Sequence, residues 1–307
     1  MSDQKISRVL QVGIVLLGIA AGTFGMSLLI PKGGFNDILA TKKPESNISQ
    51  ASLDGTASAQ AVAPATKQIM EVPKLFQGKT IYEAKLKPNE KVIALTFDDG
   101  PSPKNTAQIL EILKKNNIKA TFFMVGGMVQ LNPQVAKKVV GDGHVLGNHT
   151  WHHGYRRMDA AKAASEINST ADIIYKTTGV KTTLFRPPGG FLKNGLVDYA
   201  ISQKYAIMMW STESGDSQGR GQAPTLVKNV IQRSKPGAIV LMHDGGGNRS
   251  RTVKALPQII TGLKSQGYRF VTIPELLEIE AKAETLATKA SPAVKKAQNP
   301  NNQPKNP

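Results

Sequence analysis

The sequence predicts an α/β domain in which parallel strands are linked by crossover helices. Strand-like apolar runs and helix-like segments alternate over residues 76–281, and polar motifs follow the ends of several apolar runs. Such alternation is typical of parallel sheets, because each parallel connection needs a crossover. Alternation by itself does not distinguish a barrel from an open doubly wound sheet.

The elements follow one another regularly along the chain. Helical patterns cover Asn105–Asn116, Pro133–Gly141, Asp159–Gly179, Asn194–Lys204, Ala223–Ser234 and Thr252–Gly267. Strand-like runs lie between or before them, at Val92–Leu95, Ala120–Val125, Tyr205–Trp210 and Ala238–Met242. About 200 residues is a suitable length for one compact α/β domain with a sizeable core.

Two adjacent acids follow the first of these strands. Asp98 and Asp99 stand in the turn Thr96–Ser102, directly after the apolar run. Two like charges held this close need a cation or a shared proton to compensate them. The pair therefore suggests a metal site, although Asp, Gly and Pro in sequence are also an ordinary turn.

A histidine pair lies about fifty residues further along the chain. His149 and His153 stand at positions i and i+4, which places both rings on one face if the segment forms a helical turn. Two imidazoles and one carboxylate are a ligand set of catalytic zinc and related divalent sites. The pair alone is more often a pair of surface or core histidines. His152 projects away from His153 on such a turn, which predicts a structural role.

Three further polar groups follow separate strand-like runs: Arg186, Asp216 and His243. Each alone has an ordinary explanation, such as a solvated charge or a loop residue. Catalytic groups in alternating barrels gather at the carboxyl ends of several strands, because separate chain segments converge there. The five motifs together therefore predict one pocket.

These motifs resemble those of the polysaccharide deacetylase family, or NodB-homology domain, whose members are metal-dependent carbohydrate esterases. The resemblance covers residues 76–281 and implies a distorted (β/α) barrel. It implies Asp98 as catalytic base and His243 as general acid, with Arg186 paired to the base and Asp216 beside the acid. The implied metal ligands are Asp99, His149 and His153.

The resemblance also implies a substrate-binding group made of Pro188, Gly189, Gly190, Trp210 and Leu241. Two positions depart from the family pattern. Gly189 stands where many relatives carry Tyr, and Ser217 stands where the family usually has Trp. Both changes remove flat apolar walls against which a sugar ring could stack, so we expect altered substrate recognition with the reacting groups kept.

The implied activity is removal of N-acetyl groups from N-acetylglucosamine-type units of a cell-wall or extracellular polysaccharide. Peptidoglycan stands ahead of chitin-like polymers as the expected substrate. The implied cofactor is a divalent metal ion, zinc first, with cobalt, nickel or manganese as alternatives. A catalytically impaired glycan-binding module of the same fold is the main alternative, and a hydrolase of other amides or esters is the third.

The N-terminus predicts a membrane anchor. Residues 9–30 form a charge-free stretch of 22 residues, and spanning a bilayer core takes about 20. Lys5 and Arg8 precede it, which predicts that residues 1–8 form a cytoplasmic stub and that the catalytic domain is extracytoplasmic. The expected localisation is thus a single-pass protein of the cell membrane, with a cleaved signal peptide as the alternative.

The remaining segments are predicted to be tethers. Residues 31–75 and 282–307 are rich in small or polar residues without an apolar period, which indicates a flexible linker and a disordered tail. The chain has no Cys, which excludes disulfides and a lipoprotein anchor.

The chain is strongly basic. Its formal net charge is +17, and residues 76–281 carry 27 Lys and Arg against 16 Asp and Glu. This balance predicts a solvated basic surface that attracts an anionic polymer or a membrane face. No nucleic-acid partner is expected, because no recognised binding motif accompanies the charge. The oligomeric state is left open.

Overall fold

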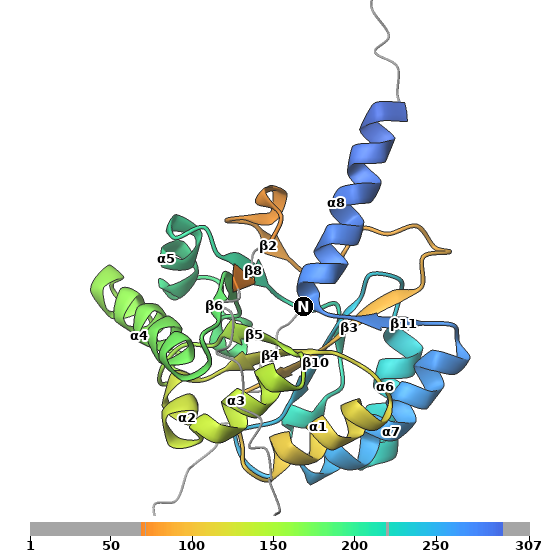
Figure 1. Cartoon of the computed structure of the whole chain (residues 1–307), viewed down its shortest axis with the longest axis horizontal. Coiled ribbons are helices and arrows are strands. Elements are labelled where there is room, and N and C mark those ends of the chain that lie inside the picture. The colour runs from red at the N-terminus through yellow and green to blue at the C-terminus, as the bar shows by residue number, and fades with distance from the viewer. Residues whose placement is uncertain (1–68, 71, 219–220, 291–307) are drawn as a thin grey trace, which may run out of the picture. The chain divides into compact units, whose positions relative to one another are not determined.

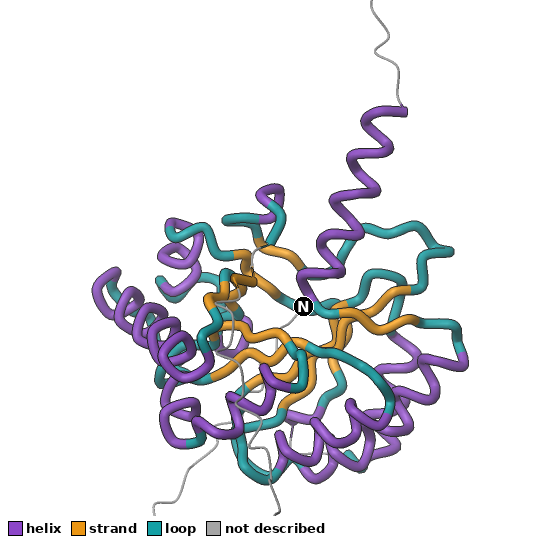
Figure 2. Tube along the Cα trace, viewed as in Figure 1, coloured by secondary structure: helices purple, strands orange, loops and turns teal. Residues whose placement is uncertain are grey.

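The computed structural model describes residues 69–70, 72–218 and 221–290, in which strands lie at the centre and helices around them (Figures 1 and 2). The strands are β1 (Ile69–Met70), β2 (Thr80–Ile81), β3 (Val92–Asp98), β4 (Thr121–Met124), β5 (Val145–Asn148), β6 (Lys181–Thr182), β7 (Leu184–Phe185), β8 (Ala206–Met208), β9 (Thr212–Glu213), β10 (Ile239–His243) and β11 (Arg269–Val271). The helices are α1 (Asn105–Lys115), α2 (Gly126–Leu131), α3 (Pro133–Gly141), α4 (Ala160–Thr178), α5 (Leu196–Ser202), α6 (Ala223–Arg233), α7 (Ser250–Ser265) and α8 (Ile273–Ala290).

The main sheet is parallel and curls into a half-barrel. Within the described residues it has nine strands, in the order β2-β8-β7-β5-β4-β3-β10-β9, with β11 added beside β3. An isolated antiparallel bridge joins Glu83, just after the edge strand β2, to Ala238, just before β10 near the other end of the sheet. Gly237 has φ 84° at this point, and a Cβ there would lie 2.0 Å from the carbonyl oxygen of Ala84. Only glycine fits this contact.

Strand β3 lies at the centre of the core and is buried along its whole length. On one face Leu95 and Phe97 belong to the same apolar cluster as Ile109 of α1 and Ile259 of α7. On the other face Ala94 belongs to a second cluster, to which α8 contributes Leu276 and Leu277. Burial on both faces is characteristic of parallel strands covered by helices.

The predicted α/β class is confirmed, and several predicted elements match closely. Helix α3 has the predicted bounds, and α4 begins after Asp159, whose side chain accepts a hydrogen bond from the Lys162 backbone N–H (2.8 Å). Helix α4 ends at Gly179, which has φ 75°. An Asp at the N-cap and a left-handed Gly at the C-terminus are strong sequence signals for the ends of a helix. They explain why both bounds of α4 could be predicted.

The ordered domain extends past both predicted boundaries. Strand β1 pairs with β6, and Val72 is buried, although residues 69–75 fall in the predicted linker. Helix α8 continues to Ala290, past the boundary predicted at 281. A two-residue strand has no period to detect, and the last turns of α8 are largely exposed and so lack an apolar face.

The predicted membrane localisation is corrected. In residues 69–70, 72–218 and 221–290, no helix combines the length and apolar character needed to cross a bilayer. The segment 9–30, which carried the prediction of a single-pass anchor, lies outside the described residues, as do the stub at 1–8, most of the linker and residues 291–307.

Parallel register brings the predicted site motifs to one edge of the sheet. The carboxyl ends of parallel strands lie on the same side of the sheet, and the register of these strands places their last residues next to one another. The register partners at this edge are His243 with Asp98, Asp98 with Phe123, Met124 with Asn148, and Asn148 with Phe185.

We predict that Asp159→Ala lowers the free energy of unfolding by about 1 kcal/mol, because it removes the N-cap of α4. Urea unfolding of the two proteins measures the difference. Asp159→Asn keeps a capping oxygen, so its free energy of unfolding should be close to that of the unmodified protein. The same is expected of Asp172→Ala, on the exposed face of the same helix. Equal destabilisation by Asp159→Ala and Asp172→Ala would contradict the prediction.

Candidate active site and metal centre

The two adjacent acids at the end of β3 point to different partners. Asp98 Oδ1 lies 2.7 Å from Arg186 Nη1. Asp99 Oδ1 lies 2.9 Å from His153 Nε2 and 3.5 Å from His149 Nε2. The backbone of Asp99 has φ 75°, a left-handed conformation that lets the second carboxylate leave the strand direction. The carboxylates therefore have separate environments.

Arg186 follows β7 and is fully buried. Besides Asp98, its guanidinium donates to the carbonyl oxygens of Met208 (2.8 Å) and Met209 (3.0 Å) and to Thr96 Oγ1 (2.8 Å). Burial lowers the pKa of Arg186 and the charge of Asp98 partly restores it, but arginine stays protonated in proteins. The residue was predicted to pair with Asp98, and the structure places the two in contact.

The three predicted metal ligands converge on one point. One ligand atom from each of Asp99, His149 and His153 lies within 4.8 Å of the other two. His149 Nδ1 is 2.7 Å from the Arg186 carbonyl oxygen. Donation to that carbonyl leaves the Nε2 lone pair of His149 free, as in histidines that bind metals.

The donor set fits a divalent cation. Asp99 Oδ1 is buried and has no well-aligned hydrogen bond, although it faces both rings. Burial acts to raise the pKa of Asp99, but His149 and His153 outweigh it and hold that pKa well below its usual range. Two imidazole nitrogens and one carboxylate oxygen with open positions are a ligand set of catalytic zinc.

The prediction that a helical turn pairs the histidines was wrong. Residues 149–153 form an irregular loop after β5, with φ 68° at Thr150 and 55° at His153. The buried Glu166 of α4 holds this loop by accepting hydrogen bonds from the backbone N–H groups of Trp151 (3.0 Å) and His152 (2.9 Å). The His152 ring also contacts Glu166 (Nδ1 to Oε1, 2.7 Å), so it points away from the ligands, as predicted.

His243 and Asp216 form a second acid–base pair. His243 Nδ1 lies 2.7 Å from Asp216 Oδ1, while Asp216 Oδ2 accepts from the His243 backbone N–H (2.8 Å) and from Thr252 Oγ1 (2.7 Å). Burial disfavours the charged ring, but the hydrogen bond and charge of Asp216 outweigh it and raise the pKa of His243. Burial likewise acts to raise the pKa of Asp216, and His243 reverses this and lowers it.

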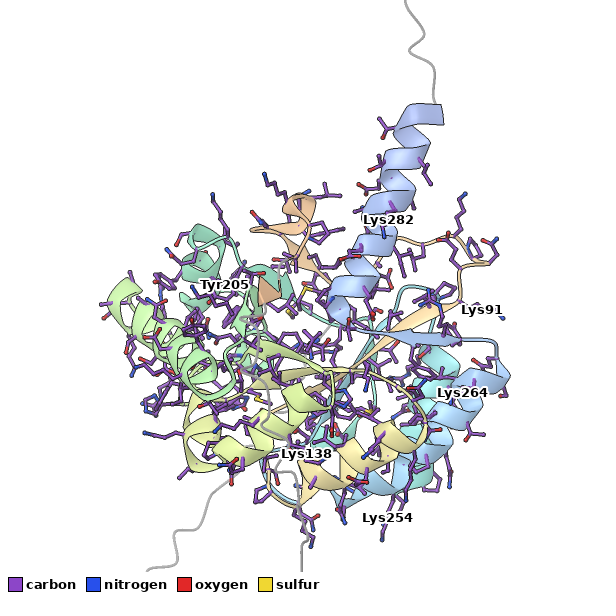
Figure 3. The ribbon with its side chains drawn as sticks, in the orientation of Figure 1. Lys91, Lys138, Tyr205, Lys254, Lys264 and Lys282 are labelled. Carbon is purple, nitrogen blue, oxygen red and sulfur yellow. The ribbon has the colours of Figure 1, made fainter. Side chains whose placement is uncertain are left out.

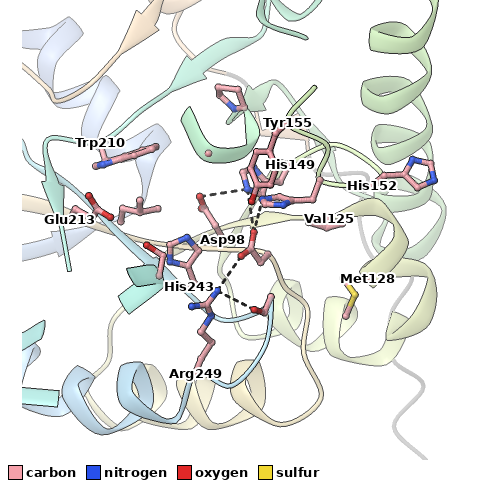
Figure 4. A pocket seen from close by; sticks show the side chains of 17 residues that line it. Asp98, Val125, Met128, His149, His152, Tyr155, Trp210, Glu213, His243 and Arg249 are labelled. Carbon is pink, nitrogen blue, oxygen red and sulfur yellow. Dashed lines mark hydrogen bonds and ion pairs between the residues drawn. The ribbon is translucent and has the colours of Figure 1, made fainter. Parts of the chain in front are cut away.

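Sequence reasoning missed Arg249, which links three of the motifs. Its guanidinium donates to the carbonyl oxygens of Gly245 (2.6 Å) and Asp216 (3.2 Å) and lies 3.5 Å from Asp99 Oδ2 (Figure 4). An Arg after a glycine-rich turn has no distinctive pattern, so only the fold shows this contact.

One cavity of about 670 Å³ contains most of the predicted site. Its walls include both acids, the two ligand histidines and His243, with Trp210, Leu241 and Gly189 of the predicted substrate-binding group. Pro188 and Gly190 are not among its lining residues. Pro187 lines the cavity instead, and a Cβ on Gly190 would lie 2.8 Å from the Trp210 ring, so Gly190 packs behind the wall.

Gly189 does not leave an open wall. It has φ 60°, and a Cβ built on it would lie 2.9 Å from a ring carbon of Tyr155 and 2.9 Å from one of Phe191. Two aromatic rings from other positions thus occupy the space beside this glycine. Neither was singled out from the sequence.

The fold and the site together define a hydrolase with a candidate metal centre: an Asp–His–His cluster that could hold a metal ion shares one cavity with a carboxylate and a histidine. The chain belongs to the polysaccharide deacetylase family, hydrolases that act on carbon–nitrogen bonds, and the polysaccharide deacetylase family model matches residues 85–208.

Two peptidoglycan deacetylases are similar to this chain in sequence. It is 42% identical over 190 residues to a peptidoglycan-N-acetylglucosamine deacetylase of Bacillus cereus, covering 62% of this chain and 89% of the relative. It is 39% identical over 204 residues to the peptidoglycan-N-acetylmuramic acid deacetylase PdaC of Bacillus subtilis, covering 66% of this chain and 42% of PdaC.

Two solved structures are similar to this fold. The Bc1960 peptidoglycan N-acetylglucosamine deacetylase has a TM-score of 0.62 at 33% identity, covering 66% of this chain and 94% of that one. BA3943 of Bacillus anthracis, a CE4 family pseudoenzyme, has a TM-score of 0.60 at 34% identity, covering 65% and 69%.

We predict that Asp99→Asn lowers affinity for zinc more than about 100-fold, since even removing a ligand's hydrogen-bond partner costs about 10- to 100-fold. Calorimetric titration of the metal-free protein with zinc measures this. His152→Ala is the matched control in the same loop: its backbone N–H still reaches Glu166, so zinc affinity should be retained. Equal losses in the two variants would refute the ligand assignment.

Proposed function

We propose that this protein is a metal-dependent deacetylase that releases acetate from N-acetylglucosamine-type units of peptidoglycan. The observation that carries the proposal is the single cavity in which Asp98, paired with Arg186, and His243, paired with Asp216, face the Asp99–His149–His153 cluster. We assign the catalytic domain to residues 76–281; β1 (Ile69–Met70) pairs with β6, and α8 continues past residue 281 to Ala290.

Asp98 is the proposed base. Its Oδ1 is bound by Arg186, whereas its Oδ2 lies 3.8 Å from His149 Nε2 and so faces the metal ligands. The buried guanidinium of Arg186 holds Oδ1 in place and leaves Oδ2 on the side of the metal ligands. Asp98 Oδ2 is therefore the oxygen that takes a proton from water near the cluster.

A metal ion held by Asp99, His149 and His153, which we propose to be zinc, would polarise the acetamide carbonyl and acidify water. Leu241, in register beside β3 and lining the cavity, is the proposed wall of the acetyl-methyl pocket. The exposed backbone of Gly189 lines the cavity and is the proposed oxyanion donor.

His243 is the proposed general acid. An amine leaves poorly unless it is protonated, and His243 Nε2 is the free nitrogen because Nδ1 is engaged by Asp216. The raised pKa of His243 lets the ring keep this proton to higher pH than an ordinary imidazole would. Asp216 and Arg186 thus position the acid and the base respectively.

Peptidoglycan is favoured over neutral chitin-like polymers by two observations. Both curated relatives reported above act on peptidoglycan sugars. Residues 76–281 also carry a net charge of +11, and Figure 3 shows Lys91 and Lys254 of this range at the periphery of the ribbon. A basic surface attracts an anionic wall polymer.

A glycan-binding module without turnover is the competing proposal, and the similarity to the pseudoenzyme BA3943 favours it. Against it, the proposed acid, base and ligands are all present here and contact their expected partners.

The direct test is acetate release from peptidoglycan and from N-acetylglucosamine oligomers, with and without a chelator. We expect metal-dependent release, and a loss of about 10²- to 10⁴-fold in Asp98→Asn with metal content unchanged, because the base is removed. Asp142→Asn, a distant carboxylate on the helix side, should remain fully active. Glycan binding without acetate release would favour the module.

We further predict that Asp216→Asn moves the alkaline limb of the pH profile of kcat/KM to lower pH. Asp216 raises the pKa of His243, so His243 stays protonated to higher pH in the unmodified protein and loses its proton earlier in the variant. Glu213→Gln removes another cavity carboxylate that does not bond to His243 and should leave the limb in place. An unmoved limb in Asp216→Asn would remove His243 from the role of acid.

A further inference from the structure

Two exposed aromatic side chains lie together beside the catalytic cavity: Tyr155 lines the cavity, and Phe191 contacts the Tyr155 ring. Tyr155 is 53% exposed and Phe191 is 52% exposed. Single exposed apolar residues are common on protein surfaces, but adjacent large aromatics beside a polar cavity are not explained by core packing. Their position therefore calls for a ligand.

The two rings continue a row that begins at the metal ligands. Ring centroids of His149 and His153 are 4.9 Å apart, those of His153 and Tyr155 are 5.1 Å apart, and those of Tyr155 and Phe191 are 5.8 Å apart. In Figure 4 Tyr155 and Trp210 are drawn on opposite sides of Asp98. The row thus leads from the reacting groups to solvent.

Gly189 makes this arrangement possible. Tyr155 follows the β5 loop and Phe191 follows the turn after β7, and both ring edges meet over the Cα of Gly189. A larger residue at 189 would occupy the same volume, because its Cβ would already be within 2.9 Å of both rings. The chain therefore supplies aromatic surface from two loops in place of one side chain on the turn.

We propose that Tyr155 and Phe191 form an aromatic platform that binds the sugar ring adjoining the one being deacetylated. Sugar rings present faces of C–H groups that pack on aromatic rings, and buried aromatic anchors contribute much of the affinity at binding sites. Tyr155 contacts His153, which in turn contacts His149, so the proposed partner is the sugar ring next to the one at the metal ligands. This inference rests on the proposed function and specifies how that site recognises a polymer.

The experiment compares Phe191→Ala and Tyr155→Ala with Tyr155→Phe and with Tyr82→Ala. Tyr82 is a matched control, because it is 48% exposed and lines a different cavity. Acetate release is measured on N-acetylglucosamine and on its tetramer, together with hydrolysis of 4-nitrophenyl acetate, which contains no sugar, and with zinc content.

We expect both alanine variants to raise KM for the tetramer about 3- to 10-fold, the range that one aromatic contact supports. In Phe191→Ala the kcat, the zinc content and the hydrolysis of the small ester should stay close to those of the unmodified protein. Tyr155→Ala is compared with Tyr155→Phe for these quantities, because the Tyr155 ring contacts the ligand His153. Tyr155→Phe keeps the ring, so its KM for the tetramer should equal that of the unmodified protein. Tyr82→Ala should leave KM, kcat and zinc content unchanged.

Two results would overturn the platform. One is an unchanged KM for the tetramer in both alanine variants. The other is an equal loss on the small ester, which would show that the rings support the metal site instead.

The proposed function itself is tested separately, on the unmodified protein. It fails if that protein releases no acetate from any glycan in a metal-dependent way. Calorimetric binding of the tetramer to Phe191→Ala then decides the platform: weaker binding supports it, and an unchanged Kd refutes it.

Discussion

The buried side chain of Arg186 is the interaction on which the site depends. A charged group without solvent is tolerated only when its donors are paired, and here Asp98, Thr96 and two backbone carbonyls accept them. Breaking such a pair typically costs about 3–5 kcal/mol. The carbonyl of the same residue orients His149, so one arginine links the proposed base to a metal ligand.

Backbone strain is concentrated where the metal ligands converge. Among the described residues, five non-glycine positions have positive φ, and Asp99, Thr150 and His153 are three of them. Such conformations cost free energy and persist only when the surroundings impose them. Glu166 supplies part of that restraint from α4, by binding the loop between the two histidines.

Local signals made much of the fold and the reacting groups predictable. Asp159 and Gly179 mark the ends of α4, and the polar residues after β3, β7 and β10 indicated the catalytic edge. The helical geometry expected for His149 and His153 was wrong, because an i, i+4 spacing does not show whether the backbone is helical. Arg249, Glu166 and the Tyr155–Phe191 pair act through contacts between distant segments, which no local pattern reveals. The membrane anchor was predicted from residues 9–30, outside the described part, and is not retained.

The separation between a buried reacting layer and an exposed rim has an evolutionary consequence. Arg186 and Asp98 are enclosed, and a change in either disturbs the other, whereas Tyr155 and Phe191 lie on the surface of two loops. On the proposed function, a single substitution at the rim would change which polymer binds and leave the enclosed acid, base and metal ligands unaltered. Substrate preference can then evolve separately from the reaction.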